Sequence, residues 1–366
     1  MTAKYTSVVE PLPSTVPFVG PEHQERQRGA PFKARIGANE SVFGPSSSVV
    51  EAIAKAGPEA WMYCDPNMHD LRMAIAGHNG IDPDSIVIGE GIDGLFGNTV
   101  RLFVERGDKV VTSLGAYPTF NYHVAGFGGE LITVPYVDDR EDPESLLAAA
   151  REHRPKLVFI ANPDNPMGTW HGAEKIRALI DGLPDGTLLC LDEAYIEFAP
   201  GGTAMPWDTD DRRVIRFRTF SKAHGMAGMR IAYAVTHPET ATAFDRIRNH
   251  FGVNRVAQEA AIASLADGAH LADVVNKTAT ARERIAEIAR ENGLTALPSA
   301  TNFVAVDCGR DGDYARAVLQ ALLKRGLFVR MPGVAPLDRC IRIGAGTPED
   351  LALLADALPE ALAEAG

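Results

Sequence analysis

Residues 218–230 hold the side chains of this sequence that could do the most chemistry. Thr219 and Ser221 carry hydroxyls, Lys222 carries an amine and Arg230 a guanidinium, and the segment lies between two apolar runs. That pattern predicts a loop between two strands. Hydroxyls and a guanidinium can hold a phosphate, and a lysine of lowered pKa can form a Schiff base with an aldehyde. The alternative is a basic surface loop with a solvated lysine.

An aldehyde and a phosphate occur together in pyridoxal 5'-phosphate (PLP), whose ring nitrogen is paired with an aspartate in the enzymes that use it. Asp192 is the candidate because it directly follows the apolar run 188–191, where a carboxylate must be paired or neutralised. Tyr195 could bond the phenolic oxygen of the cofactor. The alternatives are a structural ion pair or a helix cap for Asp192, and core packing for Tyr195.

Three further segments offer groups for the same ligand. The turn 162–169 contains two prolines and a glycine, which fix the amide of Asn165. A glycine-rich turn at residues 89–94 precedes a helix that we expect over residues 95–104. Free N–H groups of that turn favour an anion, although Asp93 could simply cap the helix. Tyr117 could lay its ring on a flat cofactor or pack in the core.

Two arginines lie in predicted strands of the C-terminal part. Arg342 stands in an apolar strand, where a guanidinium suits a substrate carboxylate, and a structural ion pair is the alternative. Arg330 has the same two interpretations. The histidines show no metal-ligand spacing, so no metal site is predicted.

The elements that must position these groups alternate in type. Short apolar runs alternate with helical segments from about residue 85, which predicts an α/β fold whose mostly parallel, seven-stranded-type sheet has helices on both faces. Ligands of such sheets bind beyond the carboxyl ends of the strands. Asn165, Asp192 and Lys222 each follow the end of a predicted strand, and we therefore expect them to meet at one edge.

The pattern changes along the chain. Residues 1–45 are proline-rich at first and predict an N-terminal arm and part of a small domain. Residues 46–250 predict the large domain, and residues 251–366, with long helical patterns and a few strands, predict a smaller α+β domain.

Composition excludes several classes of protein. The 366 residues carry a net charge of −12, with a pI near 5.3, which argues against nucleic acid or an anionic membrane as the main partner. No apolar run approaches a bilayer span, and the N-terminus lacks the apolar stretch of a signal peptide. Four cysteines without close pairing fit a reducing compartment. We expect a soluble protein of the cytoplasm.

Together these segments resemble the fold-type I PLP-dependent aminotransferases of class I/II, and among them the histidinol-phosphate aminotransferase branch. They occur in the order of that family and extend over nearly the whole chain. The segments that carry the resemblance are Ala38-Asn-Glu, Gly91-Ile-Asp, Ala116-Tyr-Pro, Asn162-Pro-Asp-Asn-Pro-Met-Gly, Asp192-Glu-Ala-Tyr-Ile-Glu-Phe, Arg218-Thr-Phe-Ser-Lys-Ala with Arg230, and Cys340-Ile-Arg-Ile with Gly346-Thr.

The resemblance implies roles for these residues. Lys222 would bind the cofactor and then move the proton at the substrate Cα, and Asp192 would pair with the ring nitrogen. Tyr195 and Asn165 would bond the phenolic oxygen, and Tyr117 would stack on the ring. The remaining roles implied are phosphate binding by Thr219, Ser221, Arg230 and the backbone at Gly91, Ile92 and Asp93, phosphate binding across a homodimer by Tyr63, and substrate binding by Arg342, Arg330 and Asn39.

Three departures from the branch concern the substrate side. Gly37, Cys64 and Met167 replace an asparagine, a proline and a threonine that are common there. We therefore expect an aminotransferase that uses an amino acid, with glutamate the first choice, and a 2-oxo acid or a phosphorylated amino compound. A PLP-dependent decarboxylase of a phosphorylated amino acid, an aromatic amino acid aminotransferase and a PLP-sensing regulator are the alternatives.

Overall fold

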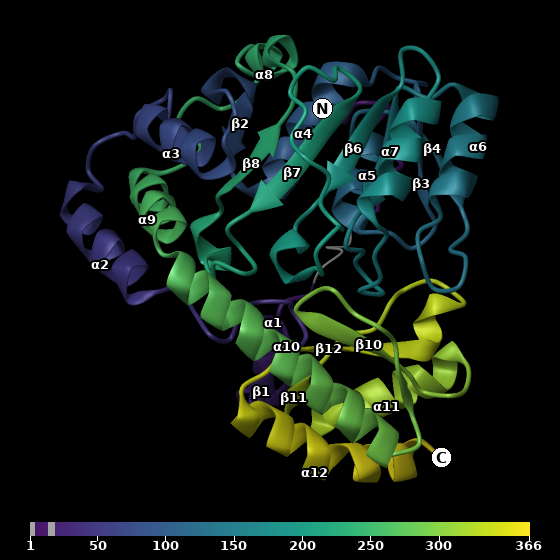
Figure 1. The fold of residues 1–366 in the computed structure, drawn as a ribbon. Coiled ribbons are helices and arrows are strands. Elements are labelled where there is room, and N and C mark those ends of the chain that lie inside the picture. The colour runs from purple at the N-terminus through teal and green to yellow at the C-terminus, as the bar shows by residue number, and fades with distance from the viewer. Residues whose placement is uncertain (1–3, 14–18) are drawn as a thin grey trace.

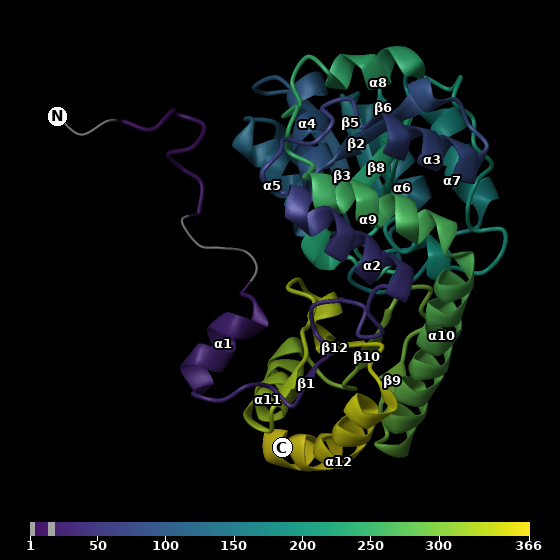
Figure 2. The ribbon, with the colours of Figure 1, turned by 90° about the vertical axis from the view of Figure 1, so that its left-hand side faces the viewer.

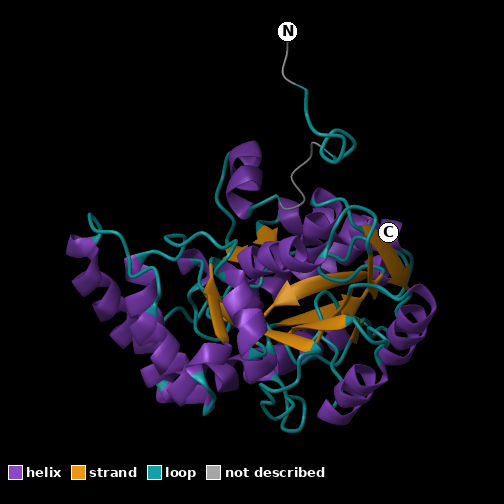
Figure 3. Cartoon of the chain, turned by 90° about the horizontal axis from the view of Figure 1, so that it is seen from above, coloured by secondary structure: helices purple, strands orange, loops and turns teal. Residues whose placement is uncertain are grey.

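The computed structural model describes residues 4–13 and 19–366, so residues 1–3 and 14–18 of the predicted arm lie outside the described residues. Figure 1 shows a larger unit built on a central sheet above a smaller unit that contains the C-terminus. Seen from above, the strands lie between helices (Figure 3).

The central sheet has seven strands in the order β2-β8-β7-β6-β5-β3-β4. All neighbouring pairs are parallel except those made by β8, which runs antiparallel to both β2 and β7. The predicted mostly parallel sheet is confirmed. Its strands are β2 (Ile86–Gly89), β3 (Lys109–Ser113), β4 (Glu130–Val134), β5 (Leu157–Ala161), β6 (Leu188–Asp192), β7 (Val214–Thr219) and β8 (Ala232–Val235).

Successive residues of these strands enter different cores, as strand geometry requires. Phe159 and Cys190 pack under α4 and α5, whereas Val158 and Leu189 pack under α6 and α7. The strands are buried on both faces, which explains their continuous apolar runs. The helices of this unit are α2 (Ser47–Ala56), α3 (His69–Asn79), α4 (Gly91–Phe103), α5 (Pro118–Gly126), α6 (Pro143–His153), α7 (Ala173–Gly182), α8 (Pro238–Phe244) and α9 (Arg255–Ala266).

The smaller unit contains two short sheets. One has the order β12-β10-β9 and is antiparallel, and the other pairs β1 with β11 in parallel. The strands are β1 (Ala34–Arg35), β9 (Thr295–Ala296), β10 (Phe303–Asp307), β11 (Leu327–Phe328) and β12 (Cys340–Gly344), and the helices are α10 (Gly268–Glu291), α11 (Gly312–Lys324) and α12 (Pro348–Ala365).

Helix α10 connects the two units, and Figure 1 shows it running from α9 to the smaller unit. Val274 near its start packs in the core under the large sheet, whereas Ile285 packs in the core of the smaller unit. Helix α9 shares a core with α2 and α3. We therefore propose that the boundary between the units lies within α10 rather than at residue 250.

Some local predictions differ from the structure. The N-terminal arm is not extended throughout, because α1 (Pro21–Arg28) forms beside α11 (Figure 2), where Arg28 Nη2 donates to the Lys324 carbonyl at 3.5 Å. Helix α4 begins at Gly91, four residues before the predicted start at residue 95, since glycine there adopts a positive φ of 76°. Among residues 4–13 and 19–366, no helix has the length and apolar character needed to cross a bilayer.

Candidate active site

Three neighbouring parallel strands deliver polar residues to one edge of the large sheet. Asp192 is the last residue of β6, Asn165 follows β5 and Lys222 follows β7. Because β5, β6 and β7 are adjacent and parallel, their carboxyl ends lie side by side. The structure thus brings these three predicted residues to one place.

Lys222 is a partly buried amine. Its Nζ donates to the carbonyl of Asn39 at 3.1 Å and lies 5.7 Å from the ring centroid of Tyr195. Burial first, and then the positive charges of Arg342 and Arg230, lower the pKa of Lys222 to about 8. About one tenth of the amine is therefore uncharged at pH 7, far more than for an ordinary lysine, and this form can act as a nucleophile.

Asp192 is a buried carboxylate with little compensation from the protein. It is 5% exposed, and the donor to its Oδ1 is the backbone N–H of Ala194 at 2.9 Å. Burial raises the pKa of Asp192 to about 7, and the charge of Asp93 adds to the effect, whereas Lys222 opposes it. A protonated ring nitrogen would supply the missing positive partner.

A hydrogen-bonded group lies between the two units. The Tyr195 hydroxyl accepts from Asn39 Nδ2 at 3.0 Å and from Asn165 Nδ2 at 3.3 Å. Arg342 Nη1, from β12 of the smaller unit, donates to Asn165 Oδ1 at 2.6 Å. With both amides donating to its oxygen, the Tyr195 hydroxyl hydrogen can be donated to a ligand.

Two buried atoms in this group, Asn39 Oδ1 and Arg342 Nε, have no hydrogen-bond partner among residues 4–13 and 19–366. Burial lowers the pKa of Arg342 to about 10, which indicates a guanidinium that gains from an anionic partner. Asn39 has a φ of 57°, in the left-handed region that asparagine tolerates.

An anion-binding cradle lies at the start of α4. No side chain caps this 13-residue helix, so its first N–H groups, at Gly91, Ile92 and Asp93, are available to a ligand. Gly91 has a φ of 76°, which favours glycine, and a Cβ there would displace the guanidinium of Arg230. Ser221 Oγ accepts from Arg230 Nη1 at 3.3 Å and from Thr219 Oγ1 at 3.0 Å. These residues fit a phosphate.

The remaining predicted residues lie around this group or apart from it. Tyr117 donates to Asp93 Oδ1 at 3.2 Å at the start of α5. Arg330 Nη2 donates to the Val19 carbonyl at 2.8 Å, and its backbone pairs with Arg342. Ile92 points its side chain into the core. Tyr63 is 78% exposed and packs on Phe251 at 4.8 Å, so within one chain it is not part of the group.

Sequence reasoning missed several supporting residues. Asn302 Nδ2 donates to the Asn39 carbonyl at 3.0 Å and thereby holds the acceptor of Lys222 in place. Glu141 and Asp164 are also buried, and Asp164 directly precedes Asn165 in the chain. Asp164 belongs to the conspicuous turn, but Glu141 lies in a charged stretch that resembles a solvated loop, and no local signal could have found it.

Comparisons with known proteins agree with this geometry. The family described as "Aminotransferase class I and II" matches residues 33–358. "Histidinol-phosphate aminotransferase 1" of Mesorhizobium japonicum is 35% identical over 332 residues, which cover 88% of this chain and 89% of the relative. "Histidinol-phosphate aminotransferase" of Anaeromyxobacter sp. is 34% identical over 344 residues, covering 92% and 93%.

Solved structures are also similar. The crystal structure of histidinol-phosphate aminotransferase from Sinorhizobium meliloti in complex with pyridoxal-5'-phosphate is 55% identical, with a TM-score of 0.97 and coverage of 100% of this chain and 99% of that one. A putative histidinol-phosphate aminotransferase from Erwinia carotovora is 27% identical, with a TM-score of 0.83 and coverage of 91% and 96%.

Proposed function

This chain belongs to the class I and II aminotransferases, and on that premise we propose the parts that its residues play in a PLP-dependent transamination. The observation that carries the proposal is a partly buried lysine of lowered pKa and a buried aspartate without a charged partner, at the ends of neighbouring strands and beside an anion cradle.

PLP supplies an aldehyde that condenses with amines and a protonated ring that accepts electrons from a bond at the substrate Cα. Lys222 would hold the cofactor through its amine, and the free amine would act as general base toward the substrate Cα proton and then as general acid toward the cofactor. The Asn39 carbonyl, which accepts from Lys222 Nζ at 3.1 Å, orients the released amine. Asp192 keeps the ring nitrogen protonated.

The other residues hold the cofactor and orient the substrate. Thr219, Ser221, Arg230 and the start of α4 bind the phosphate. Tyr195 and Asn165 bond the phenolic oxygen, and Tyr117 covers the ring. Arg342 binds the substrate carboxylate, which supplies a partner for its buried Nε.

We propose that the amino donors include glutamate and a phosphorylated amino compound of the histidinol phosphate type. Relatives that match nearly the whole chain are named for that substrate. Arg330 lies next to Arg342 across a backbone bridge, and its guanidinium could bind a second anionic group of the substrate.

A homodimer is part of the proposal, because Tyr63 lies exposed and outside the active-site group of its own chain, and the resemblance gives it a role at the phosphate of a second subunit. Trp61 and Tyr63, 83% and 78% exposed, and Phe251, 48% exposed, form an aromatic surface that a second copy could cover. We also propose that the enzyme works in the cytoplasm, which the four free cysteines support.

A half-reaction screen tests the proposed function. The PLP-loaded protein is mixed with glutamate, histidinol phosphate or an aromatic amino acid while the visible band of the lysine-linked cofactor is followed. We expect glutamate and histidinol phosphate to discharge the band with formation of a keto product. Release of carbon dioxide would instead indicate a decarboxylase, and no discharge by any amino compound would refute transamination.

A further inference from the structure

Glu141 and Asp164 are two buried carboxyl groups next to the proposed active site. Glu141 is 1% exposed and lies just before α6, and Asp164 is 2% exposed and lies in the turn after β5. Each charge would be expensive to bury alone, and the reaction assigns a part to neither group.

The two carboxyl groups accept different numbers of hydrogen bonds. Asp164 Oδ1 accepts from the Tyr136 hydroxyl at 2.9 Å, and its Oδ2 accepts from the Met167 N–H at 3.0 Å. Glu141 Oε1 accepts from the Ala161 N–H at 2.9 Å, whereas Glu141 Oε2 is buried and has no partner in the described part of the chain. The Glu141 side chain faces the Asp164 carboxyl group, and the Ser113 hydroxyl, also buried without a partner there, faces Glu141.

The surroundings favour one shared proton. The titratable groups that face the pair are Tyr136, His171, Asp192 and Arg342. Burial lowers the pKa of His171, which leaves Arg342 as the cation. Burial, together with the charge of Asp164, raises the pKa of Glu141 well above its usual range, and burial raises that of Asp164 to about 7.

The pair is joined to the substrate side through one turn. The Asp164 N–H donates to the Thr169 carbonyl at 2.8 Å, and the Asp164 carbonyl accepts from the Gly168 N–H at 3.1 Å. The next residue is Asn165, which donates to Tyr195 and accepts from Arg342 at 2.6 Å. A displacement of Asp164 would therefore move both the amide and its arginine partner.

We propose that Glu141 is a positioning residue whose carboxyl group is protonated at Oε2 and donates a hydrogen bond to Asp164. This hydrogen bond holds Asn165 and Arg342 in the positions that catalysis requires. Asp164 then keeps one negative charge, shared among three donors and facing Arg342. The inference rests on the proposed function for the roles of Asn165 and Arg342.

The test compares Glu141→Gln with Glu141→Met in the PLP-loaded enzyme. Glutamine can accept from Ala161 and donate to Asp164, whereas methionine has a similar length and can do neither. We expect Glu141→Gln to stay within about twofold of the wild type, and Glu141→Met to raise KM for the amino acid about tenfold or more while the lysine–PLP band persists. Equal behaviour of the two variants would overturn the inference, because a side chain that only fills space would tolerate both.

If Glu141→Met does not fold, the pH dependence of stability tests the shared proton instead. The pKa of Glu141 in the folded protein is raised above the usual 4.5, so protonated Glu141 stabilises the fold fully below pH 4.5. This stabilisation is lost as the pH rises through the folded pKa of Glu141. The wild type should therefore lose stability relative to Glu141→Gln as the pH rises above the usual 4.5 toward the raised pKa of Glu141, and a constant difference would refute the shared proton. If the wild type itself fails to discharge its band with any amino compound, the proposed function fails instead.

Discussion

Asp192 and Glu193 are consecutive buried carboxylates, and different charges act on their side chains. Asp192 is 5% exposed and Glu193 is 2% exposed. The pKa of Asp192 is raised to about 7 by burial. For Glu193, burial acts in the same direction, but the charges of Arg218 and Arg216 outweigh it and lower the pKa below its usual value.

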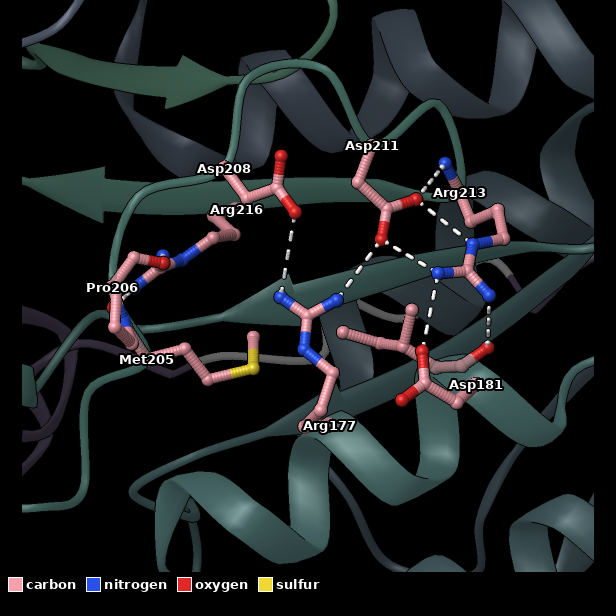
Figure 4. Close-up of polar contacts among 9 residues, drawn as sticks. Arg177, Asp181, Met205, Pro206, Asp208, Asp211, Arg213 and Arg216 are labelled. Carbon is pink, nitrogen blue, oxygen red and sulfur yellow. Dashed lines mark hydrogen bonds and ion pairs between the residues drawn. The ribbon is translucent and has the colours of Figure 1, made fainter.

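On its side of the sheet, Glu193 is paired with two arginines. Glu193 accepts from Arg216 Nη2 at 2.8 Å and from Arg218 Nε at 2.8 Å. Arg216 also donates to the carbonyls of Met205 and Pro206 (Figure 4) and lies 4.0 Å from the ring centroid of Trp207. We call this group of residues the paired side, and the cluster around Lys222 and Asp192 the open side.

The difference shows where the fold has satisfied its charges and where it has left them for a ligand. Residues at successive positions near a strand end point to opposite faces, so one peptide step separates the two environments. Charges on the paired side are matched by the chain itself, which specifies structure. On the open side, the chain supplies Asp192 with a backbone N–H and no ion pair among the described residues, as expected of a functional site whose charges a ligand completes.

The largest effect should come from Lys222→Ala. Because the proposal gives Lys222 both the covalent link and the acid–base role, we expect kcat to fall by at least about a thousandfold and the visible band to disappear. Absorbance and turnover measure these changes, with Lys324→Ala on the surface of α11 as the control. Covalent PLP in Lys222→Ala would place the linkage on another lysine and break the comparison.

The comparison itself is tested by neutralising each carboxylate in turn. Glu193→Gln leaves two buried guanidinium groups without their carboxylate, and we expect a loss of about 3 kcal/mol in the free energy of unfolding. Asp192→Asn removes a charge that lacks a partner, so the PLP-free protein should be equally or more stable, although catalysis should fall about a hundredfold. Urea unfolding separates the two, and a large loss for Asp192→Asn would contradict the assignment of the open side.

On the substrate side we expect Arg342→Ala to weaken amino acid binding selectively. Removing a partly buried guanidinium should raise KM or Kd for many amino acids about a hundredfold. PLP binding should change little, because Arg342 lies beyond Asn165 rather than in the anion cradle. Titration with amino acids and with PLP measures both, and an equal loss of the two would place Arg342 in cofactor binding.

The pH dependence of stability should depend on the cofactor. With a folded pKa of about 7, above its usual 3.8, Asp192 contributes stability that is lost as the pH rises through 7. The PLP-free wild type should lose about 1.4 kcal/mol relative to Asp192→Asn between pH 6 and 8. Bound PLP should abolish this loss by pairing the carboxylate, and a loss that persists with PLP would remove the ring nitrogen as its partner.

Much of the open side could be predicted because its residues are fixed by local pattern. Lys222, Asp192 and Asn165 each follow an apolar run, and the parallel order of the strands gathers such residues at one edge. The glycine-rich turn predicts that a helix follows it. Helix α4 begins four residues before the predicted start, because Gly91 adopts a positive φ.

Contacts between distant segments could not be predicted in the same way. Asn39 reaches Tyr195 across 156 positions, and no spacing or periodicity connects them. Glu141 lies in a run of charged residues, yet it is 1% exposed, because the turn after β5 covers it. The pairing of Glu193 with Arg216 and Arg218 depends on strand register, which composition does not encode.

The smallest effect should come from the partly exposed ion pairs of Arg177, Asp181, Asp211 and Arg213, which Figure 4 shows near Arg216 of the paired side. Arg213 bonds Asp211 at 2.9 Å and Asp181 at 3.2 Å. Asp181 is 56% exposed, so water already solvates it and the pair gains little. Asp181→Asn should change the free energy of unfolding by less than about 0.5 kcal/mol and leave kcat unchanged. If Asp181→Asn lowered the free energy of unfolding as much as Glu193→Gln, geometry rather than burial would set the strength of these ion pairs. Burial could then not explain the difference between the paired side and the open side.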